Sequence, residues 1–245
     1  MNIPSLSIII PCFNEAQNVR LVLERFKDLL VSMPYTVEVI VVDGGSTDDT
    51  PHVLEQEFAQ LNPQQFKLLL MPKRRGYGFD IMHALSHAQG DVLAWTHADM
   101  QTDPQDVLTG FSLFLAQQPA NVVIKGKRKN RHWLEELFTR GMQWVVRAKL
   151  KVALDDINAQ PKLFSKDFYQ KFLVAKAPDD FSLDLYLLYM AKKNNYQIID
   201  FPVYFAKRQF GEAKGGGSWK TRIKLIKRTF NYIAKLTNKT GSSNL

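Results

Sequence analysis

The chain has 245 residues, of which 45% are hydrophobic and 23% are charged, so its composition excludes an intrinsically disordered protein and is sufficient for one large core. The formal net charge of +8 favours an anionic partner, which leaves nucleotide phosphates, nucleic acids and acidic lipid surfaces open. The single cysteine, Cys12, excludes an internal disulfide and favours a reducing compartment.

The first hundred residues alternate between short apolar runs rich in β-branched residues and amphipathic helical patterns. Each apolar run is typical of a buried strand in a parallel sheet, and each is followed by a helical pattern. The runs cover residues 6–11, 37–43, 66–71 and 91–99, and the helices begin near residues 14, 50, 76 and 104. This repeat predicts right-handed βαβ crossovers and an α/β fold, with a doubly wound, mostly parallel sheet and helices on both faces.

The second half of the chain is less regular. We expect strands at 121–128 and 197–205, helices at 133–154 and 183–193, and a turn with a short helix at 163–172. Pro202 lies inside the last strand and favours an edge position or a bulge.

The C-terminal part begins with a glycine-rich linker, residues 211–219. Apolar residues then recur at helical spacing among lysines and arginines, which predicts a basic amphipathic helix. We therefore divide the chain into a domain of residues 1–210 and a linker with a basic helix, 211–245. The apolar stripe either enters a membrane interface or packs on the domain's own core.

No signal peptide is recognisable at the start of the sequence, and no stretch is apolar enough to span a bilayer. We therefore expect a cytoplasmic protein that is at most peripheral on the cytoplasmic face of a membrane.

Polar residues follow the four predicted strands, at the ends where parallel α/β sheets bind ligands. If the strands are neighbours, these residues converge on one crevice. Its carboxylates would hold a hard cation, and its arginines would offset the charge of a nucleotide diphosphate. The residues are Pro11, Phe13, Asn14, Glu15, Asp43, Ser46, Asp48, Lys73, Arg74, Arg75, His97, Asp99 and Gln101.

Each of these features has a second interpretation. Asp43 and Ser46 would also suit the cap of the following helix, and adjacent basic residues are usually a solvated surface run. A lone His97 is more often structural than a metal ligand. On an extended chain, however, His97, Asp99 and Gln101 point the same way, as a coordinating face requires.

Five segments resemble, in order and spacing, the inverting GT-A nucleotide-sugar glycosyltransferases. They are PCFNE (11–15), VVDGGSTDDT (41–50), RGYG (75–78), GDVLAWTHADMQTDP (90–104) and GKR (126–128). Asp156 with KLF (162–164), and FPVYFAKRQFGEAKGG (201–216), are similar to segments of the dolichyl- or polyprenyl-phosphate sugar synthases. The resemblance covers nearly the whole chain.

The resemblance implies a GT-A fold and a role for each matching position. Asp99, with Gln101 and His97, would hold Mg²⁺ or Mn²⁺ on the sugar diphosphate. The nucleoside would bind at Pro11, Phe13, Glu15 and Asp43, beside Arg74 and Arg75. Arg128 and Arg140 would meet phosphate groups of the donor or the acceptor, and Arg208, with Lys214, would meet the acceptor phosphate.

Three positions depart from the family's pattern. His97 stands where the first Asp of a D-x-D motif is usual, and imidazole suits Mn²⁺ better than Mg²⁺. Gly44 replaces a frequent second Asp, and Gln160-Pro161 replaces Gly-Phe before KLF.

The predicted reaction is a single displacement with inversion, in which Asp99, Arg128 and the cation stabilise the departing nucleoside diphosphate. A polyprenyl phosphate acceptor is already anionic and needs no strong base. A hydroxyl of a glycan or lipid would need one, and Asp156 and Asp184 are the candidates.

Two other classes of function stay open. A non-catalytic nucleotide-sugar-binding relative is suggested by His97. A nucleic-acid binder is suggested by charge alone, but the basic residues are scattered without a recognition module, so we expect no nucleic-acid partner.

Overall fold

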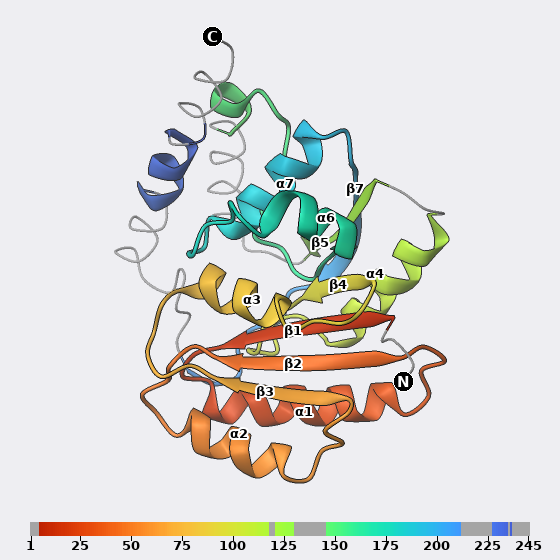
Figure 1. Ribbon diagram of the computed structural model, residues 1–245, viewed down its shortest axis with the longest axis vertical. Helices are drawn as coiled ribbons and strands as arrows, with labels where there is room; N and C mark the ends of the chain where they lie inside the picture. Colours follow the sequence, from red (N-terminus) through yellow and green to blue (C-terminus); the bar gives the residue numbers. More distant parts are fainter. Residues whose placement is uncertain (1–4, 118–120, 130–145, 212–226, 235, 237–245) are drawn as a thin grey trace.

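The computed structural model describes residues 5–117, 121–129, 146–211, 227–234 and 236. Its centre is a seven-stranded sheet in the order β3-β2-β1-β4-β6-β5-β7 (Figure 1). The strands are β1 Leu6–Cys12, β2 Val37–Asp43, β3 Phe66–Leu70, β4 Val92–Trp95, β5 Val122–Lys129, β6 Lys162–Ser165 and β7 Gln197–Tyr204. The helices are α1 Ala16–Leu30, α2 Thr50–Phe58, α3 Tyr77–Leu85, α4 Gln105–Ala116, α6 Lys166–Phe168, η1 Tyr169–Leu173 and α7 Leu183–Lys193.

The first four strands are parallel, as the sequence predicts. β1 lies between β2 and β4, so the chain first builds the sheet outward through β2 and β3 and then returns to β4 on the other side of β1. Ligands bind at such a reversal of strand order, beyond the carboxyl ends of the strands. The fold therefore places a candidate site at the ends of β1, β2 and β4.

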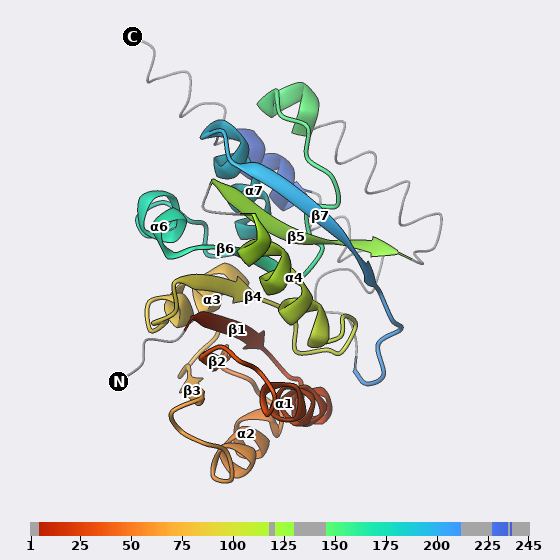
Figure 2. The same ribbon diagram turned by 90° about the vertical axis from the view of Figure 1, so that its right-hand side faces the viewer.

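Helices cover both faces of the sheet (Figure 2). Alternate residues of β1 point to opposite faces. Ile8 packs in a core with α1, α2 and α4, whereas Ile9 packs with α3 and α7. The doubly wound arrangement is thus confirmed, and its two layers hold the sheet rigidly under the site.

Three predicted boundaries are wrong. Residues 162–165, expected in a turn, form β6, which pairs antiparallel with both β4 and β5. The predicted helix 133–154 has its first part outside the described residues, and its helical stretch 146–150 ends before residue 154. The strand expected at 91–99 ends at Trp95.

β7 is an edge strand, as Pro202 predicts, because among the described strands it pairs with β5 alone. The segment after β7 returns toward the candidate site, where the backbone amide of Ala206 donates to the carbonyl of Gln101 at 2.8 Å. This contact brings the end of the domain to the carboxyl end of β4.

The described part of the C-terminal helix packs on the domain. Ile233 and Leu236 are buried in the core that contains α7, and the Tyr232 ring meets the Tyr186 ring edge-on at 6.4 Å. For these residues the docking interpretation of the apolar stripe is confirmed, while Phe230 stays exposed. Among the helices that the structure describes, none is both long and apolar enough to cross a membrane.

Candidate active site

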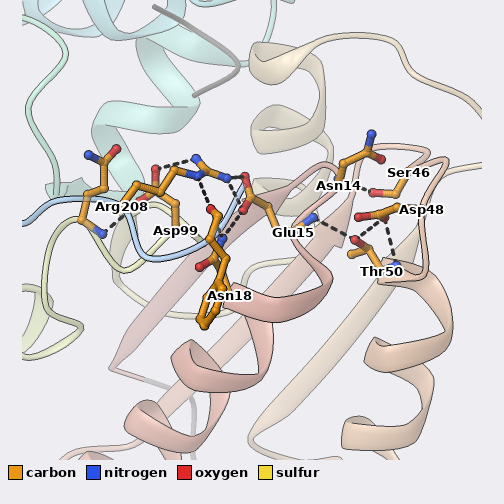
Figure 3. Close-up of polar contacts among 10 residues, drawn as sticks. Asn14, Glu15, Asn18, Ser46, Asp48, Thr50, Asp99 and Arg208 are labelled. Atoms are coloured by element: carbon orange, nitrogen blue, oxygen red, sulfur yellow. Dashed lines mark hydrogen bonds and ion pairs between the residues drawn. The ribbon is translucent and has the colours of Figure 1, made fainter. Parts of the chain in front are cut away.

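The loops after β1 and β2 are tied together by hydrogen bonds (Figure 3). The amide of Asn14 donates to Ser46 Oγ at 2.8 Å, and the amide of Thr47 donates back to Asn14 Oδ1 at 2.8 Å. The amide of Glu15 donates to Thr50 Oγ1 at 2.8 Å. Because backbone donors and side-chain acceptors alternate between the loops, the two strand ends form one fixed frame.

Asp43 organises the turn after β2. Its Oδ2 accepts from the amides of Gly45 at 3.2 Å and Ser46 at 3.0 Å, and its Oδ1 accepts from the Ser46 hydroxyl. α2 begins only at Thr50, and its N-cap Asp49 makes no side-chain cap bond. The helix-cap interpretation of Asp43 and Ser46 is therefore wrong, since both belong to the turn at the site.

The arginines of the loop before α3 lie over aromatic rings. The Arg74 guanidinium carbon is 3.9 Å from the centroid of Phe13, and that of Arg75 is 3.5 Å from the centroid of Phe79. Stacking of this kind orients a guanidinium without neutralising it. Both arginines are exposed, so their charge is available to an anion near the end of β1.

The loop after β4 does not have the geometry that the sequence suggests. Met100 has a φ of 56°, so residues 97–101 are not an extended chain. The extended chain from which we predict a common face of His97, Asp99 and Gln101 is therefore not formed. Instead, Asp99 Oδ1 accepts from the Gln101 amide at 3.1 Å. The His97 ring lies 6.5 Å from the Tyr77 ring, measured between centroids.

Arg208 joins two of the predicted donor-side carboxylates (Figure 3). Its Nη1 donates to Asp99 Oδ2 at 3.2 Å, and its Nη2 donates to the carboxylate of Glu15. Asn18 Nδ2 donates to Glu15 Oε2 at 2.7 Å and to the Phe210 carbonyl at 3.1 Å. The structure thus places Arg208, expected at the acceptor phosphate, between residues expected at the donor.

The donor atoms near Asp99 fit a divalent cation in part. Carboxylate and amide oxygens from Asp99 and Gln101 are hard ligands, as Mg²⁺ and Mn²⁺ require. Burial lowers the pKa of His97, although Asp99 and Asp184 raise it, so the imidazole is in the neutral form that binds metals. No group of three or more His, Cys, Asp or Glu side chains is placed to hold a metal within the described ranges. A cation here would take its remaining ligands from the substrate.

Both candidate bases are buried and paired with cations. Asp156 accepts from the Arg128 amide at 2.9 Å and from its guanidinium. Asp184 is 3% exposed, and its Oδ1 accepts from Lys162, from Trp95 Nε1 at 3.3 Å and from Gln160 Nε2 at 2.9 Å. Each carboxylate thus faces a cation at hydrogen-bond distance.

Residues 7–171 match the family described as Glycosyl transferase family 2. The chain belongs to glycosyl transferase family 2. This range contains both tied loops, the basic loop and Asp99.

Solved structures of nucleotide-sugar glycosyltransferases share the fold of this family 2 chain. A mannosyltransferase from Pyrobaculum calidifontis, solved with GDP-mannose and Mn²⁺, is 21% identical with a TM-score of 0.65, over 96% of this chain and 65% of that one. Glucosyl-3-phosphoglycerate synthase from Mycobacterium tuberculosis, solved with Mn²⁺, UDP-glucose and phosphoglyceric acid, is 17% identical with a TM-score of 0.70, over 94% of this chain and 80% of that one. The chain thus spans less than two thirds of the mannosyltransferase.

Two buried charged residues near the candidate site are not among those that the sequence predicts. Lys162 is fully buried against Asp184, and Asp80 is buried beside the turn after β2. The sequence marks Lys162 only as part of the KLF motif, but a charged residue at the start of an apolar strand indicates a buried charge. Asp80 gave no signal, because it lies in a helical pattern like any surface acid. Arg140 and Lys214 lie outside the described residues.

Proposed function

We propose that this family 2 protein transfers a sugar from a nucleotide-diphosphate donor to the oxygen of a polyprenyl phosphate, with inversion and with the help of Mg²⁺ or Mn²⁺. The observation that carries the choice of acceptor is the pairing of both candidate bases with buried or half-buried cations.

A hydroxyl acceptor needs a base that removes its proton during attack. Asp156 is engaged by Arg128 and Asp184 by Lys162, and a carboxylate that already bonds a cation is a poorer proton acceptor than a free one. A phosphate oxygen is already anionic and attacks without proton removal. The geometry therefore favours an anionic acceptor over a glycan or lipid hydroxyl.

The donor would lie across the ends of β1, β2 and β4. Phe13, Glu15 and Asp43 would hold the nucleoside together with Pro11, which is partly exposed at the end of β1. Arg74 and Arg75 would face the diphosphate, since their stacked guanidinium groups are oriented and still charged. These contacts would act by positioning the donor and by stabilising its developing charge.

A divalent cation, when bound, would neutralise charge on the leaving diphosphate. Asp99, Gln101 and His97 would hold it. The two structural neighbours were solved with Mn²⁺ and a nucleotide sugar, GDP-mannose in one and UDP-glucose in the other, which supports this type of donor and cofactor. The second neighbour was solved with phosphoglyceric acid, which is an anionic alternative to the polyprenyl phosphate as acceptor.

A polyprenyl acceptor would also place the protein at a membrane surface, on its cytoplasmic face in this proposal. The exposed Lys227 and Phe230 of the C-terminal helix are suited to such a surface, because a cation there meets anionic headgroups. Binding to anionic vesicles that is not reduced in a Lys227→Glu, Phe230→Ser variant would remove this support.

The proposal is tested with purified protein, UDP- and GDP-sugars, Mn²⁺ or Mg²⁺, and either polyprenyl phosphate or phosphoglycerate. We expect release of nucleoside diphosphate only with polyprenyl phosphate, and its loss in Asp99→Ala. Asp103→Ala is the matched control, because Asp103 is an exposed carboxylate of the same loop that pairs with Arg25. Turnover with phosphoglycerate and not with polyprenyl phosphate would make phosphoglycerate the acceptor. Nucleotide binding without any turnover would support a non-catalytic relative.

A further inference from the structure

Gly44 follows Asp43 at the end of β2, at the position where a second acid is frequent in the family. A Cβ at Gly44 would lie 2.4 Å from Oδ2 of Asp80 and 3.1 Å from its Cγ. Carbon and oxygen atoms do not approach so closely without a bond, so a side chain at residue 44 would force the Asp80 carboxyl group to move. The space beside the backbone of residue 44 is filled by a carboxyl group that comes from α3 instead.

One carboxyl oxygen of Asp80 lacks a hydrogen-bond partner among the described residues. Asp80 is 5% exposed, and the oxygen without a partner is Oδ1. A buried polar atom without a partner costs free energy, so one that persists needs a reason. The neighbouring Asp43 differs, because its two oxygens accept from Gly45 and Ser46.

The surroundings of Asp80 are those of the donor site. Gly44 is bonded to the end of β1, where its amide donates to the Cys12 carbonyl at 2.9 Å. The guanidinium groups of Arg74 and Arg75 are near enough to act on the pKa of Asp80, but they stack on the rings of Phe13 and Phe79. Asp80 therefore faces the junction of the two strand ends that would hold the nucleoside.

We propose that Asp80 is a nucleoside-binding residue, whose carboxyl accepts a hydrogen bond from an N–H or O–H group of the donor's nucleoside in the place of an acid at position 44. This inference rests on the proposed function, because it assigns a contact to the same donor site.

The charge state of Asp80 makes the contact sensitive to pH. The pKa of Asp80 is raised to about 6, first by burial and then by the negative charge of Asp43, while Arg74 and Arg75 oppose both. At the end of β1, the thiol of Cys12 has its pKa raised by burial and by nearby acids, Asp80 among them. An accepting carboxylate is ionised, so nucleotide affinity should fall as the pH drops through about 6.

The test compares probes with and without a nucleoside. Calorimetry with Mn²⁺ measures the Kd of UDP, GDP, CDP, ADP and inorganic pyrophosphate for the wild type, Asp80→Ala and Asp80→Asn. We expect Asp80→Ala to bind the preferred nucleotide about tenfold or more weakly. Pyrophosphate, which has no nucleoside, should keep its affinity. In Asp80→Ala the Kd values of the four nucleotides should differ less than in the wild type. In Asp80→Asn the Kd of the preferred nucleotide should no longer depend on pH.

Two controls separate a ligand contact from structural support. Asp106→Asn removes another carboxyl whose pKa is about 6, on α4, and should leave binding and its pH profile unchanged. The exchange variant Gly44→Asp, Asp80→Ala should recover much of the affinity, because it returns a carboxylate to the same space from β2.

The outcomes are distinct. An equal loss for pyrophosphate would make Asp80 a support of the loop and overturn the inference, as would unchanged nucleotide affinity in Asp80→Ala or no recovery in the exchange variant. A wild type that binds no nucleoside diphosphate would overturn the proposed function itself. Asp80→Ala should fold normally, because it removes a buried carboxyl oxygen without a partner among the described residues, and a Tm no lower than that of the wild type would verify this.

Discussion

Arg208 and Asp99 are joined by a hydrogen-bonded ion pair of 3.2 Å, and the same guanidinium also bonds Glu15. The three side chains are each less than about one sixth exposed, and they come from the ends of β1, β4 and β7. One cation thus closes the sheet's carboxyl edge by holding two acids that would repel each other without it.

Arg208→Ala should therefore destabilise the protein by about 3 kcal/mol, since it leaves two partly buried carboxylates without their cation. Urea unfolding at neutral pH measures the loss. Arg25→Ala, which breaks the exposed pair with Asp103, should cost less than about 1 kcal/mol. Mn²⁺ should raise the Tm of Arg208→Ala more than that of the wild type, because Asp99 is then free to bind it. If Arg208→Ala were as stable as Arg25→Ala, the bridging role of Arg208 would be contradicted.

Lys162 and Asp184 form a fully interior ion pair, and breaking it should be costly. Lys162→Met leaves the Asp184 carboxylate buried without its cation, beside neutral donors such as Trp95 and Gln160, so we expect a loss of about 3 to 5 kcal/mol. The double variant Lys162→Met, Asp184→Leu should recover a large part of the loss, since it removes the stranded charge.

The measurement is chemical unfolding, with Lys171→Ala as the control on the exposed Lys171–Asp167 pair. A double variant that is less stable than Lys162→Met would show that the carboxylate has a further structural role.

Glu38 should stabilise the fold through its charge. It is buried, and it accepts from Ser7 Oγ at 2.5 Å, from Lys67 Nζ at 2.6 Å and from the Gln89 amide at 2.6 Å. Burial raises the pKa of Glu38, but the hydrogen bonds from Lys67, Ser7 and Gln89 outweigh it and leave the pKa below its usual value. This contribution is present above the unfolded pKa, near 4.3, and is lost as the pH falls through the folded pKa.

Glu38→Gln should thus be less stable than the wild type by about 2 kcal/mol at neutral pH, and the difference should shrink below about pH 4. Urea unfolding at several pH values measures it. Glu57→Gln serves as the control, because Glu57 pairs with Arg20 at the surface. A difference that is constant with pH would show that packing, and not charge, is responsible.

The first half of the fold was predictable because each strand there is a continuous apolar run, buried on both faces. β1 has only one residue of seven that is not fully buried, and β2 has none. β6 was not predictable, because four residues carry little pattern and become a strand only by pairing with β4 and β5. The strand before Asp99 was predicted too long, since polar residues followed without a glycine or proline to mark its end.

The candidate site was predictable in its composition but not in its contacts. Glu15, Asp43 and Asp99 follow strands, which is a local property of the sequence. The bond between Glu15 and Arg208 joins residues 193 positions apart, and only the return of the chain after β7 creates it. The place of Asp80 beside Gly44 likewise depends on how α3 packs over β1 and β2.

Asp80 should lower the stability of the protein at neutral pH, in keeping with a binding role. Its pKa is raised to about 6, first by burial and then by Asp43, whereas an unfolded Asp titrates near 3.9. The penalty is absent below the unfolded pKa, grows as the pH rises toward 6, and is complete above it. Asp80→Asn should therefore be more stable than the wild type by about 2 kcal/mol above pH 7, and equal to it near pH 4.

Thermal and urea unfolding at pH values across this range, without nucleotide, measure the effect of Asp80 on stability. Asp28→Asn, at an exposed position of α1, should leave the stability curve unchanged. Addition of the preferred nucleotide should then stabilise the wild type more than Asp80→Asn at neutral pH, because a ligand that donates to the carboxylate relieves its burial. An Asp80→Asn variant that is less stable than the wild type at every pH would show that the carboxylate has a partner in the free protein.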